Sequence, residues 1–130
     1  MKKIISALLA LVLTFGCVFA LASCGDPAKD SEDAVEALKD EDYSVTVKEN
    51  IGDVETTVYA FKNDVNNKTF DEIELYYFKS EEAAEKAWET LSELYEKEAE
   101  TKKGSNAEIK YGIKGNLIYK GTEDAVKAAK

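Results

Sequence analysis

Carboxylic acids are the only abundant side chains in this sequence that could perform acid–base chemistry. The 130 residues contain 26 Asp and Glu and no His. Three of these acids, Asp71, Glu72 and Glu74, lie close together beside Tyr76. Two carboxyl groups acting as acid and as base or nucleophile can hydrolyse a glycosidic bond. Because Glu72 and Glu74 alternate with apolar residues, they are also the solvated charges expected on the polar face of a strand.

Residue types exclude most other catalytic chemistries. Without His there is no imidazole base, no Ser-His-Asp triad and no His-ligated zinc. None of the serines lies in a motif resembling a nucleophile elbow. The segment Asp64-Val65-Asn66 starts like a calcium loop, but Thr69 and Leu75 stand where such a loop needs Gly and Glu. The sequence therefore predicts a protein that is not an enzyme and that holds no cofactor or metal ion.

A cysteine at position 24 ends a long apolar segment. Two lysines follow Met1, the nineteen residues 4–22 are almost wholly apolar, and Leu21, Ala22 and Ser23 immediately precede Cys24. This arrangement resembles the signal peptide and lipobox of bacterial lipoproteins. The resemblance implies cleavage between Ser23 and Cys24 and transfer of a diacylglycerol to the Cys24 thiol. The alternative is an uncleaved transmembrane anchor, since roughly twenty residues span a bilayer.

The same resemblance implies a location and a domain organisation. It places an exported, lipid-anchored protein on the outer face of the cytoplasmic membrane, as for the short, acidic, lysine-rich lipoproteins of Gram-positive bacteria. We expect a signal peptide over residues 1–23 and a lipidated Cys with a polar tether over 24–30. Residues 31–130 are expected to form a single acidic domain, because a chain of this length can bury an adequate core.

The charge balance limits the possible partners. All 17 basic residues are Lys, and removal of a signal peptide that carries two of them would change the formal charge from −9 to −11. Without Arg the chain lacks the planar fork that reads phosphate and guanine, so nucleic-acid binding is not expected. The net charge also repels anionic lipid headgroups, so we expect membrane contact through the lipid anchor alone.

Hydrophobic periodicity predicts an α+β domain with the order α-β-β-β-α-β-β-α. Capping residues at Ser31, Ser80 and Thr122 precede three amphipathic helices: a short one over about 31–41, a long one ending near Gly104, and a short one at the C-terminus. Alternation of apolar and polar residues predicts a strand that starts at Tyr43 and strands over 54–62 and 69–78. A hairpin follows near 109–119. The first three strands should form an antiparallel meander, giving with the hairpin a sheet of about five strands.

Aromatic residues mark a possible interaction surface on this sheet. Five of them alternate along the second and third strands: Tyr59, Phe61, Phe70, Tyr76 and Phe78. They would be exposed if no helix covered their face, and they would be buried if they packed under the first and last helices. Trp88 lies on the apolar stripe of the long helix and is interpreted as a core residue. We expect a non-enzymatic binding or accessory module with an envelope protein as partner; the alternative is a carboxylate-based hydrolase of wall or extracellular glycans that uses Glu72 and Glu74.

Overall fold

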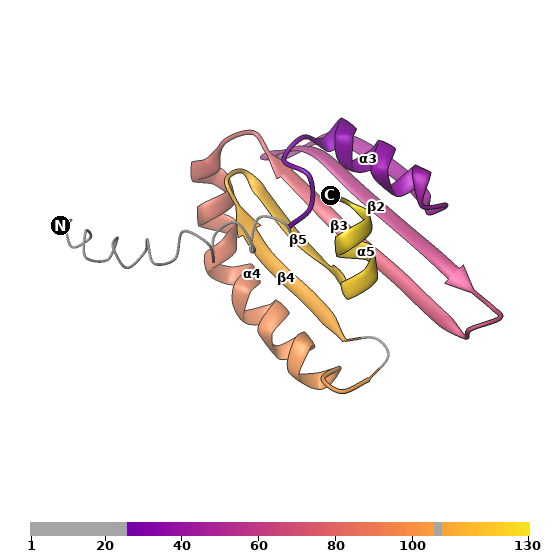
Figure 1. Cartoon of the computed structure of the whole chain (residues 1–130). Coiled ribbons are helices and arrows are strands. Elements are labelled where there is room, and N and C mark those ends of the chain that lie inside the picture. The colour runs from indigo at the N-terminus through magenta and orange to yellow at the C-terminus, as the bar shows by residue number, and fades with distance from the viewer. Residues whose placement is uncertain (1–25, 106–107) are drawn as a thin grey trace, which may run out of the picture.

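The structure, a computed structural model, describes residues 26–105 and 108–130 (Figure 1). The expected signal peptide and the lipobox residues Leu21, Ala22, Ser23 and Cys24 lie outside the described residues. The described chain confirms the predicted α+β class and element order. Its elements are α3 (Ser31–Asp40), β1 (Ser44–Ile51), β2 (Val54–Asp64), β3 (Thr69–Phe78), α4 (Glu81–Thr101), β4 (Ile109–Lys114), β5 (Leu117–Thr122) and α5 (Glu123–Ala128).

The strands form one antiparallel sheet in the order β1-β2-β3-β5-β4. The predicted meander is β1 to β3, and the C-terminal hairpin joins it through β5, which leaves β1 and β4 at the two edges. Gly121 of β5 pairs with Ile73 of β3. A Cβ atom at position 121 would lie 2.7 Å from the carbonyl oxygen of Glu72. Only glycine therefore allows β3 and β5 to approach this closely.

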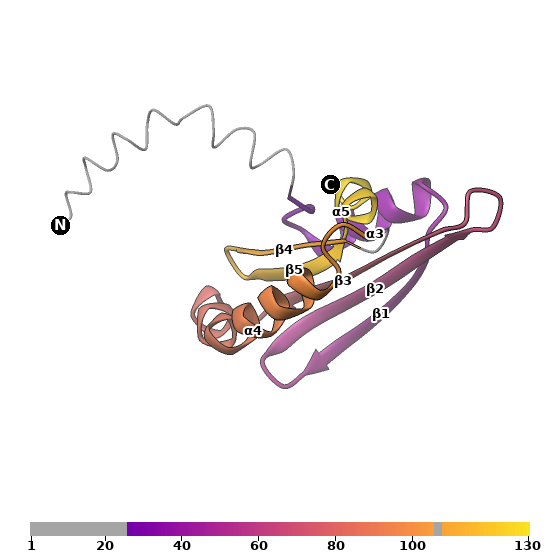
Figure 2. The ribbon, with the colours of Figure 1, turned by 90° about the horizontal axis from the view of Figure 1, so that it is seen from below.

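Helices cover both faces of the sheet and produce three layers (Figure 2). α3 and α5 lie on one face, and α4 lies on the other. Because successive strand residues point to opposite faces, Tyr77 belongs to the first layer and Phe78 to the second. The layer under α3 and α5 contains Val58, Ala60, Ile73, Leu75 and Leu117. The layer between α4 and the sheet contains Ala84 and Tyr95 of the helix and Phe78 and Ile118 of the strands.

The long helix α4 presents most of its predicted stripe to the sheet. The ring of Trp88 lies 6.2 Å from the rings of both Tyr95 and Tyr111. Trp88 thus packs with the core, as predicted. Leu94, an apolar residue between Leu91 and Tyr95 on the same helix, is 54% exposed. Leu94 lies at the margin of the stripe, because the helix turns Leu91 and Tyr95 toward the sheet instead.

The three predicted helix caps have different outcomes. Ser80 caps α4 as predicted, since its hydroxyl accepts a hydrogen bond from the Ala83 amide at 3.1 Å. Asp30, and not Ser31, caps α3 by accepting from the Glu32 amide at 2.8 Å. Thr122 precedes α5, but its hydroxyl donates to the Asp71 carboxylate at 2.8 Å. A charged acceptor forms the stronger bond, so Thr122 joins β5 to β3 instead of capping the helix.

The segment before α3 is part of the folded domain. The side chain of Pro27 is fully buried. The Ala28 amide donates to the Ala129 carbonyl at 2.8 Å, and the Tyr77 hydroxyl donates to the Ala28 carbonyl at 2.7 Å. The prediction of a polar tether over 24–30 is therefore wrong for residues 26–28, which are bonded to the domain or packed on it. Sequence reasoning missed this contact because its partners, Tyr77 and Ala129, are far away in the chain.

Within residues 26–105 and 108–130, no helix combines the length and the apolar character needed to cross a bilayer.

Candidate binding surface

Part of the sheet face that carries α4 has no helix over it. α4 packs on β4, β5 and the end of β3, whereas β1 and most of β2 extend beyond it (Figure 2). The residues that point to this side from β2 and from the beginning of β3, which α4 also leaves uncovered, include Thr57, Tyr59, Phe61, Phe70 and Glu72. We refer to these five residues as the open sheet face. Phe61 and Phe70 are exposed and the other three are partly exposed, so their outward atoms are accessible to a partner.

Three aromatic rings form a continuous row on the open sheet face. The ring centroids of Tyr59 and Phe61 are 6.0 Å apart, as are those of Phe61 and Phe70. Phe61 is 37% exposed and Phe70 is 46% exposed. These distances lie in the range where aromatic pairs attract one another, so the rings stabilise a shared apolar surface in water. Large apolar side chains that remain exposed together are typical of interaction sites.

The other two predicted aromatic residues lie elsewhere. Tyr76 and Phe78 belong to the layer under α4, and Phe78 is buried. The expectation that all five aromatics share one exposed surface is therefore wrong. Packing under the first and last helices is also wrong, because α3 and α5 lie on the opposite side of the sheet. The alternation of residues along β2 and β3 predicted that the aromatics lie on one side of the sheet. The position of α4 decides which of them are covered.

The candidate catalytic carboxylates are each bonded to a different group. The Tyr59 hydroxyl donates to Glu72 Oε1 at 3.1 Å, and the Tyr76 hydroxyl donates to Glu74 Oε1 at 2.6 Å. Partial burial, together with the bond to Glu72, raises the pKa of Tyr59. Burial, together with the bond to Glu74, raises the pKa of Tyr76. Both tyrosines thus remain protonated donors at neutral pH. Each carboxylate therefore accepts a bond from a different tyrosine.

Asp71 does not join this pair. It accepts the hydroxyl hydrogen bond of Thr122 at the end of β5, as described above. Glu74 lies opposite Lys120 in the β3–β5 register, and Lys120 itself forms an ion pair with Glu98 of α4 at 2.9 Å. The bond from Lys120, followed by that from Lys102, lowers the pKa of Glu98. The acids of β3 are therefore joined to separate neighbours instead of forming one site.

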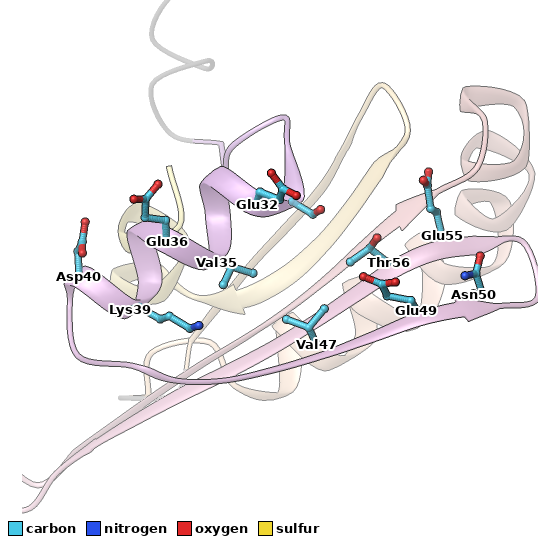
Figure 3. Close-up of a pocket in the computed structure, with 11 residues that line it drawn as sticks. Glu32, Val35, Glu36, Lys39, Asp40, Val47, Glu49, Asn50, Glu55 and Thr56 are labelled. Atoms are coloured by element: carbon cyan, nitrogen blue, oxygen red, sulfur yellow. The ribbon is translucent and has the colours of Figure 1, made fainter.

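A groove on the opposite side of the sheet was not predicted. It has a volume of about 730 Å³ and lies between α3 and the β1–β2 hairpin (Figure 3). Val35 of α3 and Val47 of β1 point into the space between them (Figure 3). One lysine, Lys39, lines the groove together with five acids: Glu32, Glu36, Asp40, Glu49 and Glu55. We refer to it as the acidic groove; its charge attracts cationic groups.

A partial signal for the acidic groove is present in the sequence. Glu32, Glu36 and Asp40 repeat every four residues and therefore lie on one side of α3. Their side of the helix faces the hairpin only in the folded domain. Glu49 and Glu55 come from strands that reach the groove through the sheet register, which local periodicity does not reveal.

In the described part of the chain, no group of three or more His, Cys, Asp or Glu residues is arranged to hold a metal ion. Comparison of the whole chain with protein-family models, with curated proteins and with solved structures finds no match. The function therefore has to be inferred from the residues and surfaces of this chain.

Proposed function

We propose that this protein is a lipid-anchored, exported module of the cell envelope that binds another envelope protein through the open sheet face. The exposed aromatic row of Tyr59, Phe61 and Phe70 is the single observation that supports this most directly. Aromatic side chains are enriched at the centres of protein interfaces, because they bury much apolar area with little loss of side-chain entropy.

The surroundings of the row indicate the chemistry of the partner. The carboxylate of Glu72 lies beside the aromatic row and is held there by Tyr59. The chain as a whole carries a formal charge of −9. A partner that presents an apolar side chain next to a basic one would complement both features. We therefore expect an envelope protein with an apolar patch bordered by Lys or Arg.

The anchor itself is proposed from the lipobox. Cys24 follows Leu21, Ala22 and Ser23 at the end of the apolar segment. Two acyl chains on one residue give stable membrane attachment, whereas a single chain gives only reversible binding. Mass spectrometry of the mature protein tests this directly. A first residue Cys24 that carries diacylglycerol supports the anchor, and a retained signal peptide or a bare Cys24 contradicts it.

The binding surface is tested by cross-linking in native membranes. The full-length protein and a Phe61→Ala, Phe70→Ala variant are compared for the partner that each captures. Leu94→Ala is the matched control, because Leu94 is an exposed apolar residue on α4, outside the open sheet face. We expect the double variant to lose a cross-linked species that the wild type and the control retain. Identical recovery from all three proteins would count against this binding surface.

The glycan hydrolase remains a separate prediction, and no contact in the described residues favours it over binding. It requires turnover of purified cell-wall glycans that is lost in both Glu72→Gln and Glu74→Gln. Such a result would show that the protein is a glycan hydrolase and not a binding module.

A further inference from the structure

The first described residue is bonded to the sheet. The Asp26 carboxylate accepts a hydrogen bond from the Tyr119 hydroxyl at 2.9 Å and lies 3.8 Å from the Lys114 ammonium. With Pro27 buried and Ala28 bonded at both its amide and its carbonyl, the chain is held from Asp26 onward. Gly25 is therefore the only residue between the proposed lipid-bearing Cys24 and a residue bonded to the domain.

This connection is too short to hold the domain away from a bilayer. Two residues of fully extended chain span at most about 7 Å between the Cα atoms of residues 24 and 26. The headgroup layer on each side of a bilayer is roughly 5–8 Å thick. A diacylglycerol attached at Cys24 places its acyl chains in the hydrocarbon core. Asp26 then lies at the level of the headgroups, and the surface around it must contact them.

Lysines gather at this point of the domain. Besides Lys114, both Lys110 and Lys127 line a cavity of about 480 Å³ together with Asp26. Lys127 also pairs with Glu123 at 3.4 Å, and more than half of each side chain is exposed. This region holds three lysines, Lys110, Lys114 and Lys127, and two acids, Asp26 and Glu123, although acids outnumber lysines in the chain as a whole. We refer to Asp26, Lys110, Lys114 and Lys127 as the anchor side.

The anchor side faces away from the open sheet face. Tyr119, which holds Asp26, belongs to the core layer under α3 and α5. In Figure 2 the start of the described chain lies on the same side of the sheet as these two helices, and α4 lies on the other side. The aromatic row points to the side of α4. The sheet thus separates the point of attachment from the proposed binding surface.

We infer that the anchor side rests on the headgroups of an anionic bilayer and fixes the orientation of the domain, so that the open sheet face points away from the membrane. This inference rests on the proposed lipidation of Cys24. Net charge predicts that the domain is repelled by such a membrane. The acidic groove lies on the same side of the sheet, so the attraction is confined to the lysines of the anchor side on β4 and α5. The short connection holds these lysines near the headgroups, within about one Debye length, where electrostatic attraction acts.

The orientation is tested with the lipidated protein in phosphatidylcholine vesicles that contain phosphatidylglycerol. Once lipid occupies the Cys24 thiol, a single engineered cysteine can be labelled with a fluorophore. Glu123→Cys places the label on α5 beside the anchor side, and Leu94→Cys places it on α4. We expect a headgroup quencher to quench the label at position 123 severalfold more than the label at position 94. Equal quenching at the two positions would overturn the inference.

Two variants separate the contributions to the orientation. Insertion of about ten Gly and Ser residues after Gly25 gives the connection a flexible reach of about 17 Å, which should sharply reduce the difference between the labels. In the insertion variant, the remaining difference in quenching between the two labels should be larger with phosphatidylglycerol than without it. The double variant Lys110→Gln, Lys127→Gln should remove this dependence on phosphatidylglycerol. If the insertion leaves the difference in quenching unchanged, the short connection does not fix the orientation. If phosphatidylglycerol does not change the difference in quenching, the lysines do not contribute to the orientation.

Mass spectrometry of the same preparation distinguishes the two proposals. If Cys24 carries no diacylglycerol, the anchored function fails and the orientation fails with it. If Cys24 is lipidated but the labels are quenched equally, the anchor stands and only the orientation is wrong.

Discussion

Replacing Tyr77 with Phe removes one buried hydroxyl group and leaves the size of the side chain almost unchanged. Tyr77 is 4% exposed, and its hydroxyl donates to the Ala28 carbonyl at 2.7 Å. Burial raises the pKa of Tyr77, and the nearby charges of Asp30 and Asp33 raise it further. The hydroxyl therefore stays protonated at neutral pH and continues to hold the N-terminal segment on the sheet.

The expected loss of stability follows from this one bond. A typical hydrogen bond contributes about 0.5–1.5 kcal/mol net, and a carbonyl left without a partner away from water costs about 1–3 kcal/mol. The bond between Tyr77 and Ala28 is partly buried. We therefore expect Tyr77→Phe to lower the free energy of unfolding by about 1–3 kcal/mol. In a domain of this size each 1 kcal/mol lowers Tm by about 4–8 °C. Amide exchange at Ala28, which donates to Ala129, should also become faster.

Urea denaturation of the mature chain with Cys24→Ser provides the assay. The sequence contains a single Trp, so fluorescence of Trp88 reports on the core under α4 without another indole. Tyr59→Phe is the matched control, because its hydroxyl also bonds across strands, at 3.1 Å to Glu72, but lies on the open sheet face where water can replace it. We expect the control to lose less than about 1 kcal/mol. If both variants lose the same stability, the N-terminal segment is not held as described.

Three further predictions concern the stability of the domain. Burial raises the pKa of Tyr43 and Tyr95 to about 12; because the unfolded chain loses these protons near pH 10, their contribution is complete below pH 10. It should fall by about 1.4 kcal/mol per tyrosine per pH unit between pH 10 and 12, and urea midpoints that stay constant over this range would contradict it. Glu36→Gln removes two like-charge i,i+4 pairs along α3 in the acidic groove, so the free energy of unfolding should rise by about 0.4–1 kcal/mol at low salt. A decrease in urea denaturation would show that Glu36 is stabilising. Gly121→Ala introduces a Cβ atom 2.8 Å from the Ile73 side chain as well as 2.7 Å from a backbone oxygen, and should cost about 1–3 kcal/mol. An unchanged Tm would show that β3 and β5 can separate at little cost.

Local patterns in the sequence determined the elements and their faces. Alternation in β3 placed Ile73, Leu75 and Tyr77 on one side of the sheet, because successive side chains of a strand point in opposite directions. Ser80 marked the start of α4, because a hydroxyl before an amphipathic segment satisfies a free amide of the first helical turn. The lipobox is likewise a local pattern of four consecutive residues, and the proposed location of the protein depends on it alone.

The structure alone decided which of these faces are covered. Tyr76 and Phe61 occupy the same side of neighbouring strands, yet α4 packs over Tyr76 and leaves Phe61 exposed. The pairing of β5 with β3 places Tyr119 where it can hold Asp26, at a sequence distance of 93 residues. Periodicity reports the direction of a side chain relative to its own element. Which other element meets that side chain depends on strand order and helix placement, which are set by burial of the whole core.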